Sequence, residues 1–366
     1  MSISLIVNGT PYTEFMSASC TVSLETLAND FSFTASSVRG IPPFKYRDIV
    51  EVRVDGVTKV TAPITGITGQ ESEGAHTVTY TGRDQTSDLL DSDINSLGDI
   101  ASDKLTLKRL IELVIADIGS SVTVVDLLSA APFNKAEDYI APQVGDNAWD
   151  FLRRYAAKRQ AILTSDGSGR VVITQAEPVS SGAKLQKVTG GTSINNILSQ
   201  DWTIDNDKRF NKYIVKAQLD PLSLNFAGDT STGTLAAQGG LVTDAEIPKG
   251  RQSVTVESKS YGNDELEDRA LWAKQLAKAE ALRYSCTVKG HSYPGTGKVW
   301  QENTLVLINS DAADISTEML LNSATFSAGE GQPTITTLEF VEKNVYLINA
   351  KALAAKKIGK QNDAFF

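Results

Sequence analysis

Polar and apolar positions alternate with a period of two over the first 93 residues of the chain. Successive side chains of a β-strand point to opposite faces of its sheet, so this alternation is typical of strands with one buried face. Turn pairs, Asn8-Gly9 and Asp55-Gly56 among them, separate the alternating runs. Residues 1–93 are therefore predicted to form a β-sandwich or β-barrel domain. The predicted strands are 2–7, 21–23, 49–54 and 77–81.

The next segment has the period of a helix. Residues 105–118 place leucine, isoleucine and valine side chains on one stripe, which predicts a helix that packs against a core. A second helix is predicted after Asp146 or Asn147, either of which can cap its free amides. A strand, turn and strand pattern over 161–174 follows. Residues 94–176 are therefore predicted to be an α/β insert.

The strand pattern then returns, and residues 177–345 are predicted to form a second β domain. A stretch over 227–240 is rich in Gly, Ser, Thr and Ala, which favours a mobile loop. Residues 264–284 place small side chains on one helical stripe and predict a long helix that lies close to a sheet. Residues 346–366 form a C-terminal tail.

The two β regions contain a faint internal repeat. Three blocks of the first region correspond, in the same order, to three blocks of the second, and the spacing drifts by only a few residues. This predicts two related β modules with the insert between them. The alternative, that any two runs of period two align somewhere, stays open. The corresponding blocks are 49–52 with 304–307, Ile67 with Phe326, and 77–80 with 337–340.

Composition and charge narrow the class of protein. The chain has 366 residues, of which 41% are hydrophobic and 22% charged, as in a globular protein with more than one core. The net charge of -9, from 44 acidic and 35 basic residues, argues against specific nucleic-acid binding. No apolar run approaches the length of about 20 residues that a membrane helix needs. Cys20 and Cys286 are expected to be reduced.

The chain lacks the usual signals of catalysis. Neither His76 nor His291 has neighbours at metal-ligand spacing, and there is no nucleophile elbow or dinucleotide fingerprint. We therefore expect no enzyme, no metal and no cofactor. Acidic residues cluster after the first β region, where helix caps and turns in a solvated linker are the favoured reading and a glycosidase carboxylate pair is the alternative. The clustered residues are Asp84, Asp88, Asp91 and Asp93.

Two sets of residues are candidate partner contacts. The second helix carries a basic side, which either meets an acidic partner or is the wet side of an amphipathic helix. The tail has a basic, helical segment and an aromatic end, which is either a docking tail or a frayed end. The candidate residues are Arg153, Arg154, Lys158 and Arg159 on the helix, and Lys356, Lys357, Phe365 and Phe366 in the tail.

Two stretches resemble a known family. The run VGDNAWDFLRRYAAKRQAILTSDGSGRVVIT, residues 144–174, resembles the helix and hairpin of Mu-like phage tail hub proteins and of the related late-control and type VI secretion spike proteins. The helix over 264–284 and the run CTVKGHSYPGTGKVWQENTLVLI, residues 286–308, resemble the helix, strand and Gly-x-x-Trp turn of the same family. The resemblance covers most of the chain in element order.

The resemblance implies a mainly β, α+β fold with two related, tube-like β-barrel domains. It implies a structural hub in the baseplate of a contractile phage tail, located in the virion and assembled in the host cytoplasm. Such a hub is a homotrimer that adapts a six-fold tube to a three-fold spike. Its partners are further copies of itself, the tail tube or distal tube protein, the central spike and the baseplate wedge proteins, and DNA only in passage.

The chain departs from the spike proteins because no repetitive β-helical needle follows residue 345. The resemblance is therefore to a hub without a fused spike. Two alternatives stay open. One is the hub of a tailocin or secretion-type injection machine, and the other is a cell-wall-binding or wall-cleaving tail protein whose insert holds sugar.

Overall fold

The computed structural model describes most of the chain. It is mainly β, with twenty-two strands and four helices among the described residues. The tail predicted over 346–366 and residues 227–238 of the predicted loop lie outside them, whereas Gly239 and Gly240 belong to strand β17 (Gly239–Thr243). The described ranges are 2–36, 43–72, 75–98, 100–101, 105–129, 139–140, 142–159, 161–175, 179–190, 195–217, 239–257 and 263–343.

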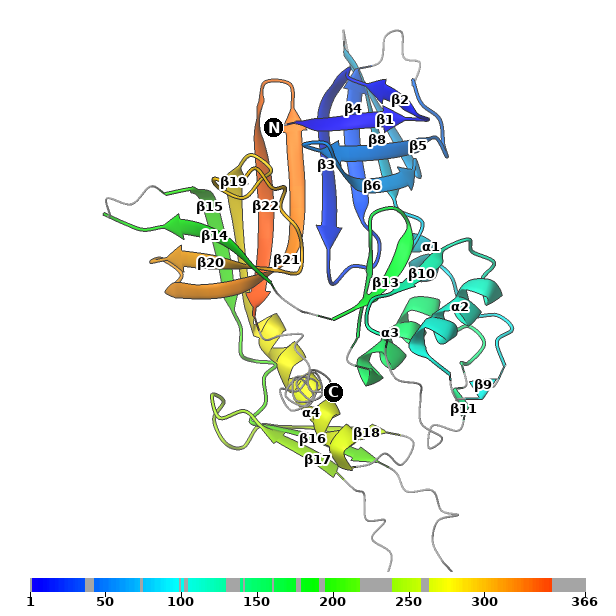
Figure 1. Ribbon diagram of the computed structural model, residues 1–366, viewed down its shortest axis with the longest axis vertical. Helices are drawn as coiled ribbons and strands as arrows, with labels where there is room; N and C mark the ends of the chain where they lie inside the picture. Colours follow the sequence, from blue (N-terminus) through cyan, green and yellow to red (C-terminus); the bar gives the residue numbers. More distant parts are fainter. Residues whose placement is uncertain are drawn as a thin grey trace, which may run out of the picture.

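One long sheet runs through the molecule (Figure 1). Eight strands follow one another in the order β15-β19-β22-β21-β3-β4-β8-β7, and every neighbouring pair is antiparallel. The bounds are β3 (Phe15–Ser23), β4 (Asp30–Ser36), β7 (Gly66–Ser72), β8 (Ala75–Arg83), β15 (Ile197–Ile204), β19 (Leu282–Lys289), β21 (Ile315–Gly329) and β22 (Gln332–Glu342).

A second layer covers one face of this sheet. Strands β2-β1-β5-β6 form a smaller sheet whose β6 contacts β3, β4 and β8, and the parallel pair β14 and β20 continues from the edge of β21. One apolar core, with Phe33, Tyr80, Tyr284 and Phe340 at its centre, fills the space between the layers. The bounds are β1 (Ile3–Val7), β2 (Thr10–Tyr12), β5 (Ile49–Val54), β6 (Val57–Pro63), β14 (Val179–Lys187) and β20 (Thr304–Ser310).

The two halves of the long sheet repeat one strand order. The order β3-β4-β8-β7 of the first module (β1–β8) matches β15-β19-β22-β21 of the second module (β14, β15 and β19–β22). The buried pair Phe33 and Tyr80 corresponds to the buried pair Tyr284 and Phe340, and each pair lies in register on neighbouring strands. One of the three predicted block correspondences, 77–80 with 337–340, therefore falls on equivalent strands, β8 and β22. The strands of the block 49–52 with 304–307 have different neighbours, because β5 pairs antiparallel with β1 and β6 whereas β20 pairs parallel with β14 and antiparallel with β21.

The middle block of the predicted repeat was misaligned. Ile67 lies opposite Tyr80, and the residue opposite Phe340 is Leu321. The counterpart of Ile67 is therefore Leu321, not Phe326. A bulge between Leu321 and Ser323 adds a residue to β21, and the sequence does not reveal such a bulge.

The two predicted barrels are not closed: all sheets in the described part of the chain are open. The reason is the junction between the modules, where β21 pairs with β3 from Ser323 opposite Ser23 to Gly329 opposite Ser17. Each of these strands satisfies its free backbone groups on the other module rather than on its own. The prediction of separate barrels is replaced by one shared sheet.

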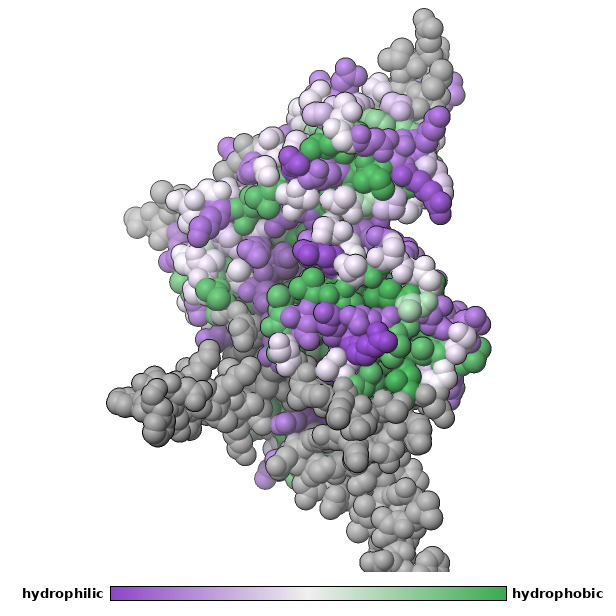
Figure 2. Space-filling view, turned by 45° about the vertical axis from the view of Figure 1, so that its right-hand side comes forward, coloured by the Kyte–Doolittle hydropathy of each residue, from purple (hydrophilic) through white to green (hydrophobic). Residues whose placement is uncertain are grey.

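The insert packs beside the first module on its own apolar core (Figure 1). Asn147 caps α3 by accepting from the amides of Trp149 and Asp150, as predicted. Strands β12 and β13 form the predicted hairpin, and β10 adds to it in parallel. In Figure 2 a hydrophilic strip crosses the insert between two hydrophobic areas. The elements are α1 (Ser87–Asp91), β9 (Ile100–Ala101), α2 (Leu107–Asp117), β10 (Thr123–Asp126), β11 (Tyr139–Ile140), α3 (Ala148–Lys158), β12 (Ile162–Ser165) and β13 (Arg170–Thr174).

A further unit interrupts the second module between β15 and β19. Helix α4 (Asn263–Ala281) covers a small sheet of order β17-β16-β18, and Gly240 lies so close to the backbone of Leu266 that a Cβ there would come within 2.2 Å. The helix ends before the predicted Tyr284, because Tyr284 is buried in β19 opposite Phe340. The remaining strands are β16 (Lys212–Ala217) and β18 (Gln252–Glu257).

Candidate functional surface of the long sheet

The face of the long sheet that turns away from the common core carries hydroxyl groups. Alternate residues on each strand point to this face, and serine and threonine recur on all eight strands. We call it the hydroxyl face. Its hydroxyl residues include Ser17, Ser19 and Thr21 on β3, Ser32 and Thr34 on β4, Thr68 on β7, Thr77, Thr79 and Thr81 on β8, Ser199 and Thr203 on β15, Ser285 and Thr287 on β19, Ser323, Thr325 and Ser327 on β21, and Thr337 on β22.

Several of these hydroxyls bond to each other across neighbouring strands. Thr21 and Thr325 join the two modules with oxygens 3.2 Å apart. Thr34 and Thr79 form a matching 3.0 Å pair in the first module, and Thr287 and Thr337 a 3.4 Å pair in the second. Cross-strand pairs of this kind stabilise a sheet while leaving a polar surface that water can wet.

Charges on the hydroxyl face are few and of both signs. Asp30 is exposed at the end of β4, and desolvation by the neighbouring residues raises the pKa of its carboxyl, although Thr21 and Arg83 act in the opposite direction. Arg83 pairs with Asp91, and Arg283 pairs with Glu25 at 3.2 Å. The described charged side chains on the face are Asp30, Arg83, Asp201, Arg283, Lys289 and Glu339. The surface is therefore near neutral, whereas the whole chain is acidic.

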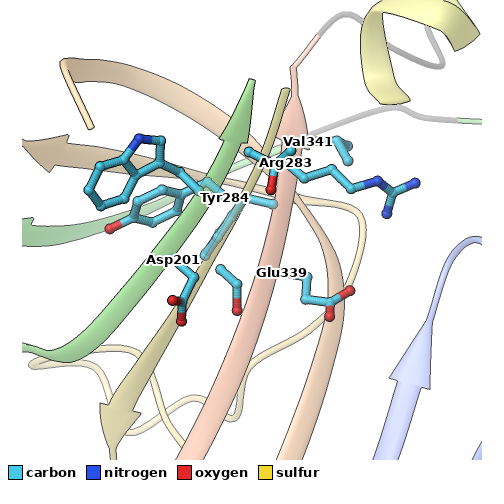
Figure 3. A pocket seen from close by; sticks show the side chains of 9 residues that line it. Asp201, Arg283, Tyr284, Glu339 and Val341 are labelled. Carbon is cyan, nitrogen blue, oxygen red and sulfur yellow. The ribbon is translucent and has the colours of Figure 1, made fainter. Parts of the chain in front are cut away.

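A shallow hollow lies on this face where β15, β19 and β22 meet. Figure 3 shows Asp201 on β15 and Glu339 on β22 with Arg283 on β19 turned away from both. Ser285 lies between the two carboxylates in register with each. The hollow is open and belongs to the same polar surface rather than forming a separate enclosed site.

The aspartates that the sequence singled out do not converge. Asp84 is fully buried and accepts from Ser165, Thr86 and Asn29. The remaining three have separate partners, namely the hydroxyl of Ser120 for Asp88, the guanidinium of Arg83 for Asp91, and a backbone bridge to Asn147 for Asp93. This arrangement gives no carboxylate pair for glycosidic chemistry. The prediction of a solvated linker is wrong for Asp84, which is fully buried because it accepts hydrogen bonds from the first module and from the insert.

The histidines are likewise apart. His291 is buried, its Nδ1 lies 3.0 Å from the Thr336 hydroxyl, and burial lowers its pKa. His76 lies on β8, 3.5 Å from a carboxylate oxygen of Glu71. Over the described ranges, no three His, Cys, Asp or Glu side chains gather as metal ligands do. Cys20 and Cys286 are buried free thiols there, and burial raises the pKa of each to about 12.

Only some of the residues predicted to contact a partner lie in the described part of the structure. Arg153 and Arg154 are exposed on α3, but Arg154 bonds Asp146 at 3.0 Å and lies over the ring of Phe151, so it also holds its own helix. Arg159 is half-buried. The side chain of Lys158 and all of Lys356, Lys357, Phe365 and Phe366 lie outside the described residues.

Sequence reasoning missed the hydroxyl face. The signal was present, because serine or threonine occupies every second position in 17–23, 77–81 and 323–327. A period of two shows that two faces differ, but it cannot show that these three runs belong to one sheet. The pairing of the strands makes them a single surface.

Comparison with known proteins places the first module. Residues 2–84 match the model of the family described as Mu phage baseplate assembly protein GpP-like, N-terminal. The first module is similar to a GpP-like baseplate domain. A search of curated proteins found no match.

Solved structures extend the likeness to the rest of the chain. The 43 kDa tail protein of prophage MuSo2 from Shewanella oneidensis is 25% identical, with a TM-score of 0.78 over 95% of this chain and 100% of that one. The tail protein from Neisseria meningitidis is 20% identical, with a TM-score of 0.75 over 94% and 97%. The resemblance to Mu-like tail hub proteins is therefore confirmed.

The fold is also similar to that of a protein from a secretion machine. An E. coli type VI secretion component, described as similar to T4 tail proteins gp27 and gp5, is 11% identical with a TM-score of 0.53 over 92% of this chain and 76% of that one. At that identity the likeness concerns the fold alone. The family match and the Shewanella tail protein support a structural role in a phage tail or baseplate. None of the described helices is long and apolar enough to cross a membrane.

Proposed function

We propose that this chain is the hub of a contractile phage tail baseplate, in which three copies close into a ring around the DNA channel. The observation that carries the proposal is the repeated strand order within one continuous sheet. Three chains of two modules present six near-equivalent positions, which is what an adapter between a six-fold tube and a three-fold spike requires.

The layering of the fold supports a direction for the sheet in such a ring. The core face is covered by β1, β2, β5 and β6 in the first module and by β14 and β20 in the second. The hydroxyl face is the one left to line the channel. A near-neutral channel wall attracts the DNA phosphates only weakly. DNA can therefore pass through the channel without being held, even though the wall is not acidic.

The proposed partners are the tail tube or distal tube protein, the central spike, the baseplate wedge proteins and further copies of this chain. The proposed place is the baseplate of the virion, after assembly in the host cytoplasm. The role is structural and not enzymatic. The divisions 1–93, 94–176, 177–345 and 346–366 are kept as proposed domains, and the basic residues of α3 and the tail as proposed contacts.

The first test is the native mass of the purified full-length chain, measured by light scattering over a range of concentrations. A mass of three chains is expected. Electron microscopy of that species should show rings with an open centre. A strict monomer that also fails to form rings when mixed with purified tail tubes would overturn the hub proposal.

A second candidate is the hub of a tailocin or secretion-type injection machine, which the shared fold of the E. coli secretion component favours. A neighbouring gene for a DNA-filled capsid would decide for the phage, and its absence beside complete tail genes would decide for the other machine. A wall-cleaving tail protein would release fragments from purified peptidoglycan, and we expect none.

A further inference from the structure

The small sheet of β17, β16 and β18 is covered on one face only (Figure 1). Helix α4 packs on that face and buries its apolar side chains. Alternate residues of each strand point the other way, and the register places Leu241, Ile214 and Val254 side by side there. Leu241 and Val254 are 51% and 48% exposed, and Val256 on the same side is 66% exposed. We call this surface the open face, and its gathered apolar side chains mark an interaction site.

The charges on the open face are all positive. Lys212 and Lys216 lie on β16, two residues before and two residues after Ile214, and both are exposed. Thr243 and Gln252 lie on either side of Lys212 in register. Within the described ranges, no acidic side chain points to this face, although the whole chain carries a net charge of -9. The open face is therefore complementary to an apolar surface that carries acidic groups.

Three other occupants fit these charges poorly. A second copy that met this face with its own would bring the lysines of both copies together. The segment 351–360 of the chain contains four lysines and no acidic residue, so it is repelled in the same way. An anionic membrane gains only about 2 kcal/mol from two lysines. It also favours aromatic side chains at its surface, and the described side chains of the open face include none.

We propose that the open face docks an acidic amphipathic helix of a partner protein. Along β16, Lys212 and Lys216 are about 13 Å apart, and two turns of a helix rise about 11 Å. Acidic side chains about seven positions apart on a helix therefore reach both lysines, while the apolar side chains between them lie over Ile214. Helix α4 shows that this sheet accepts a helix on its other face. The inference goes beyond the hub proposal and does not depend on the ring.

A synthetic helix tests the charge complementarity. The probe is a fluorescein-labelled peptide with two glutamates at that spacing and leucines between them, in a background of alanine and glutamine. A second probe has lysines in place of the glutamates. Fluorescence anisotropy with the purified full-length chain should show the glutamate probe bound at least tenfold more tightly than the lysine probe.

Two variants of the open face separate its charge from its apolar row. Lys212→Glu with Lys216→Glu should weaken the glutamate probe at least tenfold and favour the lysine probe. Leu241→Ser with Val254→Ser should weaken both probes. All four positions except Leu241 lie on β16 or β18, and all four are exposed, so circular dichroism should show an unchanged fold.

Matched controls change exposed residues of the second module instead. Lys184→Glu with Lys289→Glu and, separately, Val179→Ser should leave the binding of both probes unchanged. Equal binding of the two probes by the unmodified chain, or binding that survives the charge reversal, would overturn the inference.

Two further measurements identify a different occupant. Vesicles of phosphatidylcholine and phosphatidylglycerol that bind the unmodified chain but not Lys212→Glu with Lys216→Glu would assign the open face to a membrane and overturn the inference. A native mass that falls in Leu241→Ser with Val254→Ser would assign it to a second copy and overturn it as well. An unmodified chain that is a monomer and still prefers the glutamate probe would support this inference while the hub proposal fails.

Discussion

The insert and the small β16–β18 sheet are both additions to the repeated modules, but they are attached in different ways. The insert has a broad apolar core of its own and docks on the first module through a buried polar cluster. The small sheet has a thin core, in which Tyr213 and Val215 meet Leu266 and Ala270 of α4.

The polar cluster under the insert is compact and buried. Ser165 of β12 donates to Asp84 at 2.6 Å, and both residues are buried. The next turn adds a backbone bond from Thr61 to Gly167, whose positive φ suits glycine and whose Cβ position would lie 2.0 Å from the Lys59 carbonyl. The hairpin of the insert is therefore held in one position on the first module.

The small sheet relies on ion pairs. The side chain of Arg209 is 8% exposed and bonds Asp244 at 2.7 Å and Glu246 at 2.6 Å. Lys278 of α4 bonds Glu246 at 2.9 Å and Glu342 of β22 at 3.1 Å. The difference teaches that the insert is held by a broad apolar core and buried hydrogen bonds, whereas the small sheet combines a thin core with ion pairs. The two additions should therefore respond differently to mutation and salt.

Phe151→Ala should produce the largest effect. Phe151 is fully buried in the insert core, and truncation of such a side chain costs about 3–5 kcal/mol in transfer and cavity terms. Urea unfolding followed by the fluorescence of Trp149 should show the insert destabilised while the small sheet keeps its stability. Equal destabilisation of both units would show that the insert and the small sheet are not stabilised independently.

Asp244→Ala should destabilise the small sheet by about 3 kcal/mol, because it leaves Arg209 buried with only the more exposed Glu246 as an anionic partner. Hydrogen exchange of the β16–β18 amides measures the loss. The insert amides are the internal control and should keep their protection. Unchanged exchange in β16 would show that packing alone holds this sheet.

Ser165→Ala should cost about 1–2 kcal/mol, since it removes the hydroxyl that donates to the buried Asp84 carboxylate and accepts from the Gly167 amide. Thr86 and Asn29 still donate to Asp84 in this variant. The effect should appear as faster proteolysis between the first module and the insert. Ser168→Ala changes a hydroxyl in the same turn that bonds only Asp166, and it is the matched control. Equal proteolysis of the two variants would show that the hydrogen bond from Ser165 to Asp84 does not hold the insert on the first module.

Within the small sheet, acid should have the smallest effect in this series. Hydrogen bonds from Arg209 and Lys278 lower the pKa of Glu246 from 4.5 to about 2. Because the folded pKa is depressed, this contribution to stability is fully present above 4.5 and is lost as the pH falls from 4.5 towards 2. The urea midpoints of the unmodified chain and Glu246→Gln should converge over that window. A constant difference would exclude this titration.

The hairpin and cap of α3 were predictable because each depends on neighbours within a few residues. Asn147 caps the helix through amides two and three positions later, and the Ser165–Gly169 turn joins strands that are adjacent in the chain. The end of α4 was not predictable in this way. Tyr284 continues a helical pattern, but its partner Phe340 comes 56 residues later and draws it into a strand.

The sequence by itself determined which residues alternate, the cap at which α3 begins and which family the chain resembles, and it indicated a repeat of two β regions. The tertiary structure decided that β21 pairs with β3, that the two modules share an open sheet, and that serines and threonines far apart in sequence form one face. The physical reason is that strands pair through backbone groups that all residues share. The pattern of side chains therefore shows which face of a strand is buried, but it does not show which strand pairs with it.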